Sequence, residues 1–193
     1  MTRIALFQSR AGIDPEANAV ALVDAISEAA RGGAEILFTP EMSGLLDRDS
    51  QRAAGKVPRE EQDGVLAACR GAAVQANIWV HVGPLAVRTE DDMLANPSIV
   101  ISAGGDVRAR YDKIHLFDVD LPSGESWRES AIYAPGSQPT VASGTPVGNL
   151  GLTICYDLRF PGLFARLAEA GADVISVPAA FTVPTGRAHW QVL

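Results

Sequence analysis

The sequence lacks an excess of positive charge. Its 193 residues include 16 Lys and Arg against 23 Asp and Glu, which gives a formal net charge of −7 at pH 7. A protein that binds a nucleic-acid backbone or an anionic lipid surface neutralises it with basic residues. We therefore expect no nucleic-acid partner and no membrane partner.

Long hydrophobic runs are missing as well. No stretch approaches the ~18 uninterrupted apolar residues of a membrane-spanning helix, and the N-terminus shows no secretory signal. These absences predict a cytoplasmic location. The hydrophobic content of 47% and the charged content of 20% are those of an ordinary globular protein. With roughly 150 residues per domain as a guide, the length predicts a single domain over residues 1–193.

Cysteine is scarce, since only Cys69 and Cys155 are present. Two distant thiols exclude the disulfide framework of a small secreted protein. Cys69 lies among alanines in a predicted helix, which favours a buried, inert thiol. Cys155 stands where the apolar run "GLTI" ends and the polar segment "YDLRFP" begins, and this position calls for another explanation.

Several common functional motifs are absent. There is no G-x-G-x-x-G, no G-x-x-x-x-G-K-[ST] and no G-x-S-x-G, which removes the usual dinucleotide, P-loop and serine-hydrolase interpretations. The histidines His81, His115 and His189 do not show the spacing of metal ligands. We expect no metal and no cofactor. A Cys-His protease stays formally open, although no histidine has a local sequence that marks it as the partner of Cys155.

The apolar patterns that are present predict alternating strands and helices, with a mixed sheet. A short run, a helix with apolar residues on one face and a second run form a first β-α-β unit, and the turn "AGGD" between two further runs indicates a hairpin. A strand, a helix and a strand recur near the C-terminus. The predicted strands span 3–8, 34–41, 77–87, 98–102, 107–112, 149–155 and 172–181, and the helices 15–31, 59–76, 161–171 and one that begins at 186.

Residues 114–150 are rich in Pro, Gly and Ser. They read as a long connection with little regular structure, and such connections are often functional.

Three reactive side chains stand at the end of a predicted strand or directly after one. They are Glu41, Lys113 and Cys155. A cysteine nucleophile reacts as the thiolate, of which an unperturbed thiol holds only roughly a few per cent near neutrality, so it needs a base, and a glutamate suits that role. A lysine suits the stabilisation of the oxyanion that forms when a thiolate attacks an amide. Each residue alone is more often a surface or core residue, but the set predicts an amidase site.

The segments "FTPEMSG", "RYDKIHLFD" and "GLTICYDLRFP" resemble, in this order, the three catalytic blocks of the nitrilase superfamily of carbon-nitrogen hydrolases. The resemblance continues through "RESAIYAPG" and "PAAFTVPTGRAHWQVL", and so covers the chain from residue 3 to its end. It implies an α/β fold, a four-layer α-β-β-α sandwich with mixed sheets, that assembles as a homodimer or a higher homo-oligomer.

The resemblance also implies a role for each matching residue. Glu41 matches the general base, Lys113 the lysine that stabilises the tetrahedral intermediate, and Cys155 the nucleophile. Glu129, in "RESAIYAPG", matches a second glutamate that positions the lysine and the substrate. The backbone N–H of Tyr156 would complete the oxyanion site.

The substrate implied by the resemblance is a small amide that bears a carboxylate. The motifs are most similar to the branch that hydrolyses deaminated glutathione and to the neighbouring ω-amidases, which act on α-ketoglutaramate. Arg159 would pair with the substrate carboxylate, or else form a salt bridge within the fold. His189 matches a motif at the edge of the site, where a packing role is the alternative.

Two further residues have alternative roles. His115 would orient the lysine, contact substrate or make a structural hydrogen bond, and Asp157 would orient a neighbour or cap the helix that follows.

The resemblance has one departure: relatives continue past "HWQVL" with further strands and an arm. We therefore expect a C-terminally truncated chain that lacks its last strands. Two other functions stay open beside the amidase. One is an inactive remnant that serves only as an interaction partner, and the other is a nitrilase proper that acts on nitriles.

Overall fold

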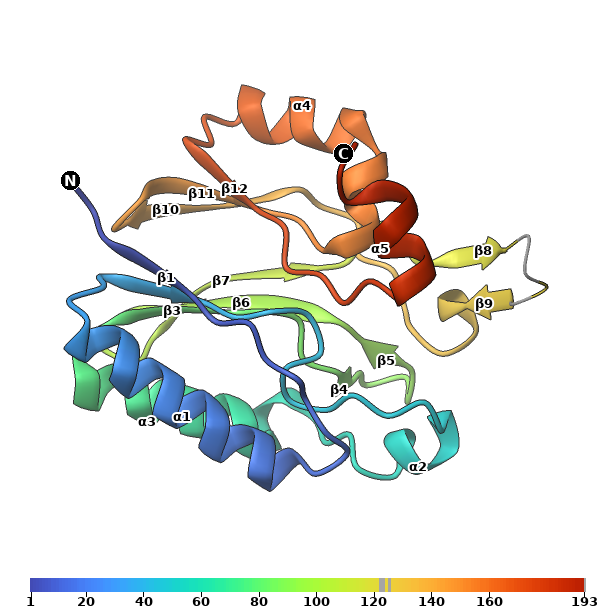
Figure 1. Ribbon diagram of the computed structural model, residues 1–193, viewed down its shortest axis with the longest axis horizontal. Coiled ribbons are helices and arrows are strands. Elements are labelled where there is room, and N and C mark those ends of the chain that lie inside the picture. The colour runs from blue at the N-terminus through green and yellow to red at the C-terminus, as the bar shows by residue number, and fades with distance from the viewer. Residues whose placement is uncertain (122–123, 125, 193) are drawn as a thin grey trace.

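The computed structural model describes residues 1–121, 124 and 126–192 of the chain, and it has four layers (Figure 1). Helices α1 (Pro15–Arg31) and α3 (Gly64–Ala76) cover the outer face of one sheet. A second sheet stacks on the first, and α4 (Pro161–Glu169) covers its outer face. The predicted α/β class and the α-β-β-α order of layers are confirmed.

The first sheet has five strands in the order β1-β2-β3-β6-β7. Neighbours β1, β2 and β3 pair in parallel, whereas β3, β6 and β7 pair antiparallel, so the sheet is mixed as predicted. The hairpin between β6 and β7 is the one that the turn "AGGD" predicts. The strands are β1 (Ile4–Leu6), β2 (Ile36–Phe38), β3 (Trp79–Val82), β6 (Pro97–Ile101) and β7 (Val107–Asp112).

The second sheet has three strands, β10 (Thr140–Thr145), β11 (Gly148–Leu152) and β12 (Val174–Ser176). The β10–β11 pair is antiparallel and the β11–β12 pair is parallel. Because α4 connects β11 to β12, this half of the molecule is the second β-α-β unit of the sequence.

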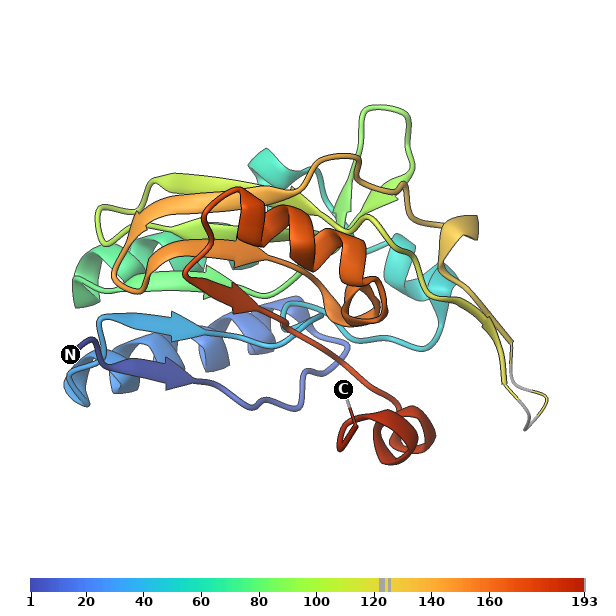
Figure 2. The same cartoon turned by 90° about the horizontal axis from the view of Figure 1, so that it is seen from above.

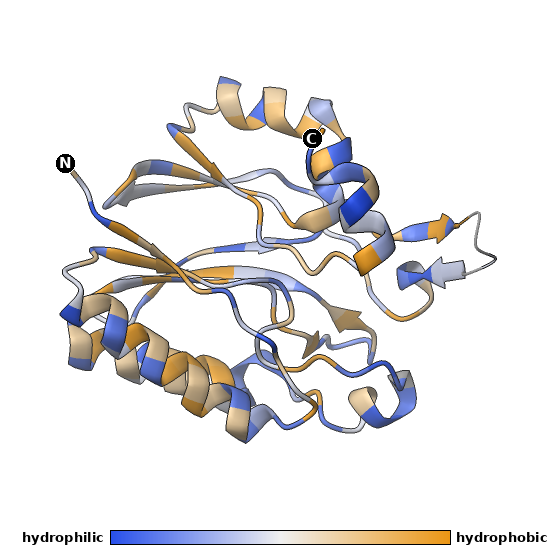
Figure 3. Cartoon of the chain, in the orientation of Figure 1, coloured by the Kyte–Doolittle hydropathy of each residue, from blue (hydrophilic) through white to orange (hydrophobic). Residues whose placement is uncertain are grey.

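The first core lies between the sheet and its two helices. Asp14 caps α1 by accepting hydrogen bonds from two backbone N–H groups, and Asn77 ends α3 in the left-handed conformation. Apolar residues of α1 and α3 pack on β2, β3 and β6, and α1 alternates hydrophobic and hydrophilic residues along its length (Figure 3). Cys69 of α3 is fully buried in this core, and burial raises the pKa of its thiol to about 12, as expected for an inert cysteine.

The second core joins the two sheets. Val100 and Tyr111 of the first sheet pack with Leu150 and Leu152 of the second, and Leu167 of α4 closes the cluster. The two sheets therefore share one apolar core.

The prediction of little regular structure over residues 114–150 is wrong. This segment contains the hairpin β8 (Asp118–Asp120) and β9 (Ser126–Arg128), a 3-10 helix (Glu129–Ala131), β10 and the start of β11. Figure 2 shows the hairpin extending away from the layers. Strands β8 and β9 have three residues each, so the 2-residue period that signals a strand is too brief to recognise in their sequence.

Other elements differ from the predicted ones in their bounds. The predicted strand 77–87 is broken after β3 at Gly83, where a Cβ would lie 2.1 Å from the carbonyl oxygen of Pro40. Helix α5 begins three residues earlier than predicted because Thr182 caps it. The remaining elements are α2 (Ser50–Ala54), β4 (Val87–Arg88), β5 (Leu94–Ala95), α5 (Val183–His189) and a 3-10 helix (Glu60–Gln62).

Every helix in residues 1–121, 124 and 126–192 is too short or too polar to cross a membrane.

Candidate active site

Three of the predicted site residues meet at one end of the sheets. Glu41 follows β2, Lys113 follows β7, and Glu129 begins a 3-10 helix. The Lys113 Nζ donates to Glu41 Oε1 at 3.1 Å and to Glu129 Oε2 at 3.0 Å. The lysine side chain is only 3% exposed. A buried ammonium thus lies between two carboxylates that are 88 residues apart in sequence.

Backbone groups hold both carboxylates in place. The N–H of Ala180 donates to Glu41 Oε2 at 2.9 Å, and the N–H of Phe117 donates to Glu129 Oε2 at 2.6 Å. Glu41 therefore contacts Lys113 through Oε1 and its backbone donor through Oε2. Glu129 contacts Lys113 through both oxygens, and its Oε2 also accepts from the backbone donor.

Cys155 stands two residues beyond Thr153, at the start of a 3-10 helix (Cys155–Arg159) and not in the strand itself. Its φ is +46°, the left-handed region that costs a non-glycine residue roughly 1–2 kcal/mol. Its N–H donates to the carbonyl oxygen of Pro178 at 2.9 Å, which helps to hold this turn. Within the described residues, the next N–H, that of Tyr156, has no protein acceptor.

The charges around Cys155 keep it a thiol at rest. Burial raises the pKa of Cys155, the negative charge of Glu41 raises it further, and the Lys113 ammonium opposes the shift. Burial lowers the pKa of Lys113, but the charges of Glu41 and Glu129 outweigh burial and raise it above its ordinary value. The site therefore combines a neutral thiol, an anionic neighbour and a fixed cation.

Asp157 does not cap the helix that follows it. Its fully buried carboxylate accepts from the N–H of Ile154, from Tyr111 Oη, and from the N–H and Nδ1 of His115. Helix α4 begins after Phe160, without a side-chain cap. Of the two predicted roles, the orienting carboxylate is the one with this geometry, and His115 makes the structural hydrogen bond.

The predicted substrate-binding residues lie around the same turn. The Arg159 guanidinium carbon lies 5.6 Å from the centre of the Tyr156 ring, and in the described part of the chain Arg159 forms no ion pair. The alternative of a salt bridge within the fold is thus not found there. His189 lies partly exposed in the last turn of α5 and has no hydrogen bond to the other predicted site residues in the described ranges.

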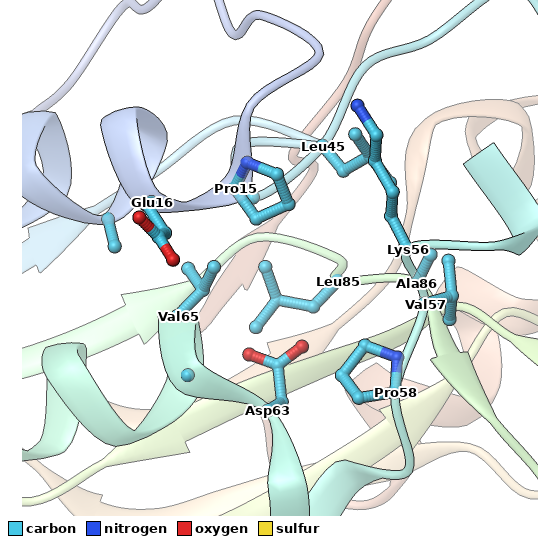
Figure 4. Close-up of a pocket in the computed structure, with 13 residues that line it drawn as sticks. Pro15, Glu16, Leu45, Lys56, Val57, Pro58, Asp63, Val65, Leu85 and Ala86 are labelled. Atoms are coloured by element: carbon cyan, nitrogen blue, oxygen red, sulfur yellow. The ribbon is translucent and has the colours of Figure 1, made fainter. Parts of the chain in front are cut away.

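Two hollows accompany these residues. One, of about 390 Å³, lies between the start of α1 and the start of α3 (Figure 4), and its lining does not include Glu41, Lys113, Glu129 or Cys155. Pro15, Pro58, Val65 and Leu85 surround it, with the Asp63 carboxylate at its edge.

The second hollow, of about 590 Å³, is open and runs along α5. Ala179, Phe181, Arg187 and Trp190 contribute to its lining. Ala179 is the neighbour of Ala180, whose N–H holds Glu41. The lining of this hollow thus comes within one residue of the backbone donor to Glu41.

Sequence reasoning missed several residues of the site. Asn96 is buried, with its Nδ2 3.5 Å from Glu41 Oε1, and among the described residues its Oδ1 has no partner. Tyr111 and the N–H of Ala180 were also not predicted. Only Asn96 has a local signal in the sequence, since it is a polar residue directly before the apolar run of β6. The contacts of Tyr111 and of the Ala180 N–H depend on the tertiary fold.

Comparison with known proteins identifies the class to which this fold and site belong. The family model described as carbon-nitrogen hydrolase matches residues 3–193. The chain belongs to the carbon-nitrogen hydrolase family.

Individual relatives agree with this assignment. A deaminated glutathione amidase from Yersinia enterocolitica is 39% identical over 98% of this chain and 66% of its own length. The C. elegans NitFhit structure matches with a TM-score of 0.87 and 32% identity over 99% of this chain and 48% of that one.

An amidase structure from Nesterenkonia sp. AN1, which shows acrylamide added to an active-site cysteine, matches with a TM-score of 0.81 and 30% identity over 98% of this chain and 71% of its own. The chain thus spans about two thirds or less of the length of the curated relatives it matches.

Proposed function

We propose that the protein is a cysteine-dependent amidase that hydrolyses a small, carboxylate-bearing amide to a carboxylate and ammonia or an amine through a thioester. The observation that carries the proposal is the contact of Lys113 with both Glu41 and Glu129 beside the strained turn of Cys155. Family membership and the names of the relatives support the same chemistry.

In the first half of the reaction, Glu41 takes the proton of the Cys155 thiol while the sulfur attacks the amide carbon. The proton transfer has to accompany the attack because the pKa of the buried thiol is raised. Lys113 and the Tyr156 N–H stabilise the oxyanion. Protonated Glu41 then donates to the departing nitrogen, so that the C–N bond breaks and a thioester remains. Ammonia leaves from a primary amide such as α-ketoglutaramate, and cysteinylglycine leaves from deaminated glutathione.

In the second half, Glu41 removes a proton from water, which attacks the thioester. The C–S bond breaks, the carboxylic acid leaves and the thiol takes back its proton. Glu129 keeps the Lys113 ammonium in place throughout, since its two oxygens lie 3.2 and 3.0 Å from Nζ. These steps need neither a metal nor an organic cofactor.

We infer that deaminated glutathione or a similar α-keto acid amide is the substrate. The relatives named for this activity support the inference. Arg159 fits the substrate carboxylate because its guanidinium lies beside Tyr156 and has no ion-pair partner among the described residues. His189, in α5 along the open hollow, would lie at the rim of the substrate site.

The proposal is tested by hydrolysis of a panel of amides, measured as ammonia released from α-ketoglutaramate and as cysteinylglycine released from deaminated glutathione. Product release that disappears in Cys155→Ala supports the amidase. The preferred amide then distinguishes an amidase for deaminated glutathione from an ω-amidase. Arg159→Lys is the matched variant for carboxylate recognition: KM should rise for carboxylate-bearing amides and stay unchanged for a neutral amide.

Two results would favour other functions. Equal, slow alkylation of Cys155 and Cys69 by iodoacetamide, with no ammonia released, would favour an inactive interaction partner. Turnover of nitriles in preference to amides would favour a nitrilase proper.

Other expectations stay predictions. They are the single domain over 1–193, the cytoplasmic location, and the absence of nucleic-acid, membrane, metal and cofactor partners. Self-association into a homodimer or a higher homo-oligomer is supported by the exposed apolar side chains Val183, Trp190 and Val192 at α5. Sedimentation velocity over a range of protein concentrations tests it.

A further inference from the structure

The buried carboxylate of Asp157 collects hydrogen bonds from two separate parts of the site. It accepts from Tyr111 Oη at 2.8 Å and from the Ile154 N–H at 2.9 Å through Oδ2. It accepts from the N–H of His115 at 3.1 Å and from His115 Nδ1 at 2.7 Å through Oδ1. An ionised carboxylate only accepts hydrogen bonds, so the His115 ring is placed as the tautomer with hydrogen on Nδ1.

The first of these parts is the segment that carries the lysine. Tyr111 and His115 lie two residues before and two residues after Lys113. The Tyr111 hydroxyl also accepts from the N–H of Ile114 at 3.3 Å. Bonds to Asp157 thus hold the chain on both sides of Lys113, where its ammonium enters the contact with Glu41.

The second part is the turn of the cysteine. The Ile154 N–H bonded to Asp157 belongs to the residue directly before Cys155, and the Asp157 N–H donates back to the Ile154 carbonyl at 2.9 Å. These reciprocal bonds span the residue with φ of +46°. Since a left-handed cysteine persists only where its surroundings hold it, Asp157 is well placed to do so.

We propose that Asp157 and His115 act as a positioning pair that sets Lys113 and Cys155 relative to each other, with His115 acting through its Nδ1 hydrogen bond and not by touching substrate. The His115 side chain is 25% exposed, whereas the Asp157 side chain is fully buried. The proposal rests on the proposed amidase function, since the positioned groups are those of that reaction.

The test compares two variants of His115 that differ in one hydrogen bond. The imidazole stacks on Phe160 at 3.7 Å, and both His115→Leu and His115→Asn lose this stacking. The Asn amide nitrogen replaces Nδ1 as a donor to Asp157, whereas Leu has no donor. Because the histidine is partly exposed, both variants are expected to fold, which thermal unfolding checks. Asp157→Asn alters the carboxylate itself, and the same measurements are made on it if it also folds.

We expect the two variants to differ in kcat. His115→Leu should lower kcat for ammonia release roughly 10- to 100-fold with KM nearly unchanged, as loss of an outer positioning contact does, and His115→Asn should recover kcat to within about threefold. Equal losses in both variants with a raised KM would overturn the proposal in favour of substrate contact. Unchanged kcat in both variants would overturn it as well.

A second readout does not depend on the amide. The rate of Cys155 alkylation by iodoacetamide, followed by mass spectrometry with buried Cys69 as the internal reference, should fall in His115→Leu and return in His115→Asn. If the unaltered protein hydrolysed no amide, the proposed function would fail, while the alkylation rates would still test the positioning pair. Alkylation rates that are the same in all three proteins would count against the pair alone.

Discussion

Replacing Lys113 by Met should destabilise the protein far more than the loss of an ordinary lysine. The variant keeps a long apolar side chain but leaves Glu41 and Glu129 facing each other without a cation. Both carboxylates are mostly buried, at 7% and 14% side-chain exposure. Each has an oxygen about 3 Å from the Lys113 Nζ, so these two oxygens are at most about 6 Å apart.

The size of the effect follows from this geometry. At about 6 Å and an effective dielectric constant of about 20, two like charges repel by about 3 kcal/mol. Removing one partner of a buried ion pair costs about 3–5 kcal/mol by the general rule, which agrees. We expect Lys113→Met to lower the free energy of unfolding by this amount at pH 7.

Urea unfolding followed by circular dichroism measures the loss in the free energy of unfolding. The midpoints can be compared if the dependence of this free energy on urea concentration is the same in both proteins. Lys56→Met is the matched control, because Lys56 is the only other lysine, is exposed and donates to the Ile13 carbonyl at 2.5 Å. It should cost less than about 1 kcal/mol.

The stability of the double variant Lys113→Met/Glu129→Gln shows whether repulsion between the two carboxylates causes the loss. Removing one of the two carboxylates relieves the repulsion, so this variant should be more stable than Lys113→Met by about 1–3 kcal/mol. A double variant that is less stable than the single one, or a loss below about 1 kcal/mol in Lys113→Met, would refute the reasoning.

Three further outcomes are expected. Glu129→Gln should lower kcat for ammonia release roughly 100-fold with little change in KM, because the Lys113 ammonium loses one of its two orienting charges; an effect on KM alone would contradict this. Cys69→Ala should cost about 1–2 kcal/mol of stability without changing kcat, whereas Cys155→Ala should abolish turnover. Burial lowers the pKa of His81 from 6.5 to about 4, so the unfolded chain takes up a proton first as the pH falls. Stability should therefore drop by about 3 kcal/mol between pH 6.5 and 4, and His81→Gln should flatten this dependence in urea titrations; parallel curves would count against burial as the cause.

The local patterns of the sequence were enough for the two β-α-β units, for the hairpin between β6 and β7 and for the positions of the reactive residues. The apolar face of α1, its cap at Asp14 and the turn between β6 and β7 all depend on residues within a few positions of one another. The same is true of the polar residues that follow strands, which is how Glu41, Lys113 and Cys155 were selected before the resemblance gave them roles.

The short strands between 114 and 150 were not predictable in this way. Residues 118–120 become a strand only because residues 126–128 pair with them, and three residues carry too little periodicity to show it. Tertiary pairing decided these elements.

Tertiary structure alone decided which side chains meet. Glu41 contacts Lys113 across 72 positions, and Asp157 accepts from Tyr111 and His115 across 46 and 42 positions. No local pattern encodes these contacts, because they depend on the order of strands in each sheet and on how the two sheets stack. The sequence by itself determined which reactive groups stand at the ends of strands, and the stacking of the sheets determined that Lys113 lies between two carboxylates, while Asp157 ties its segment to the turn of Cys155.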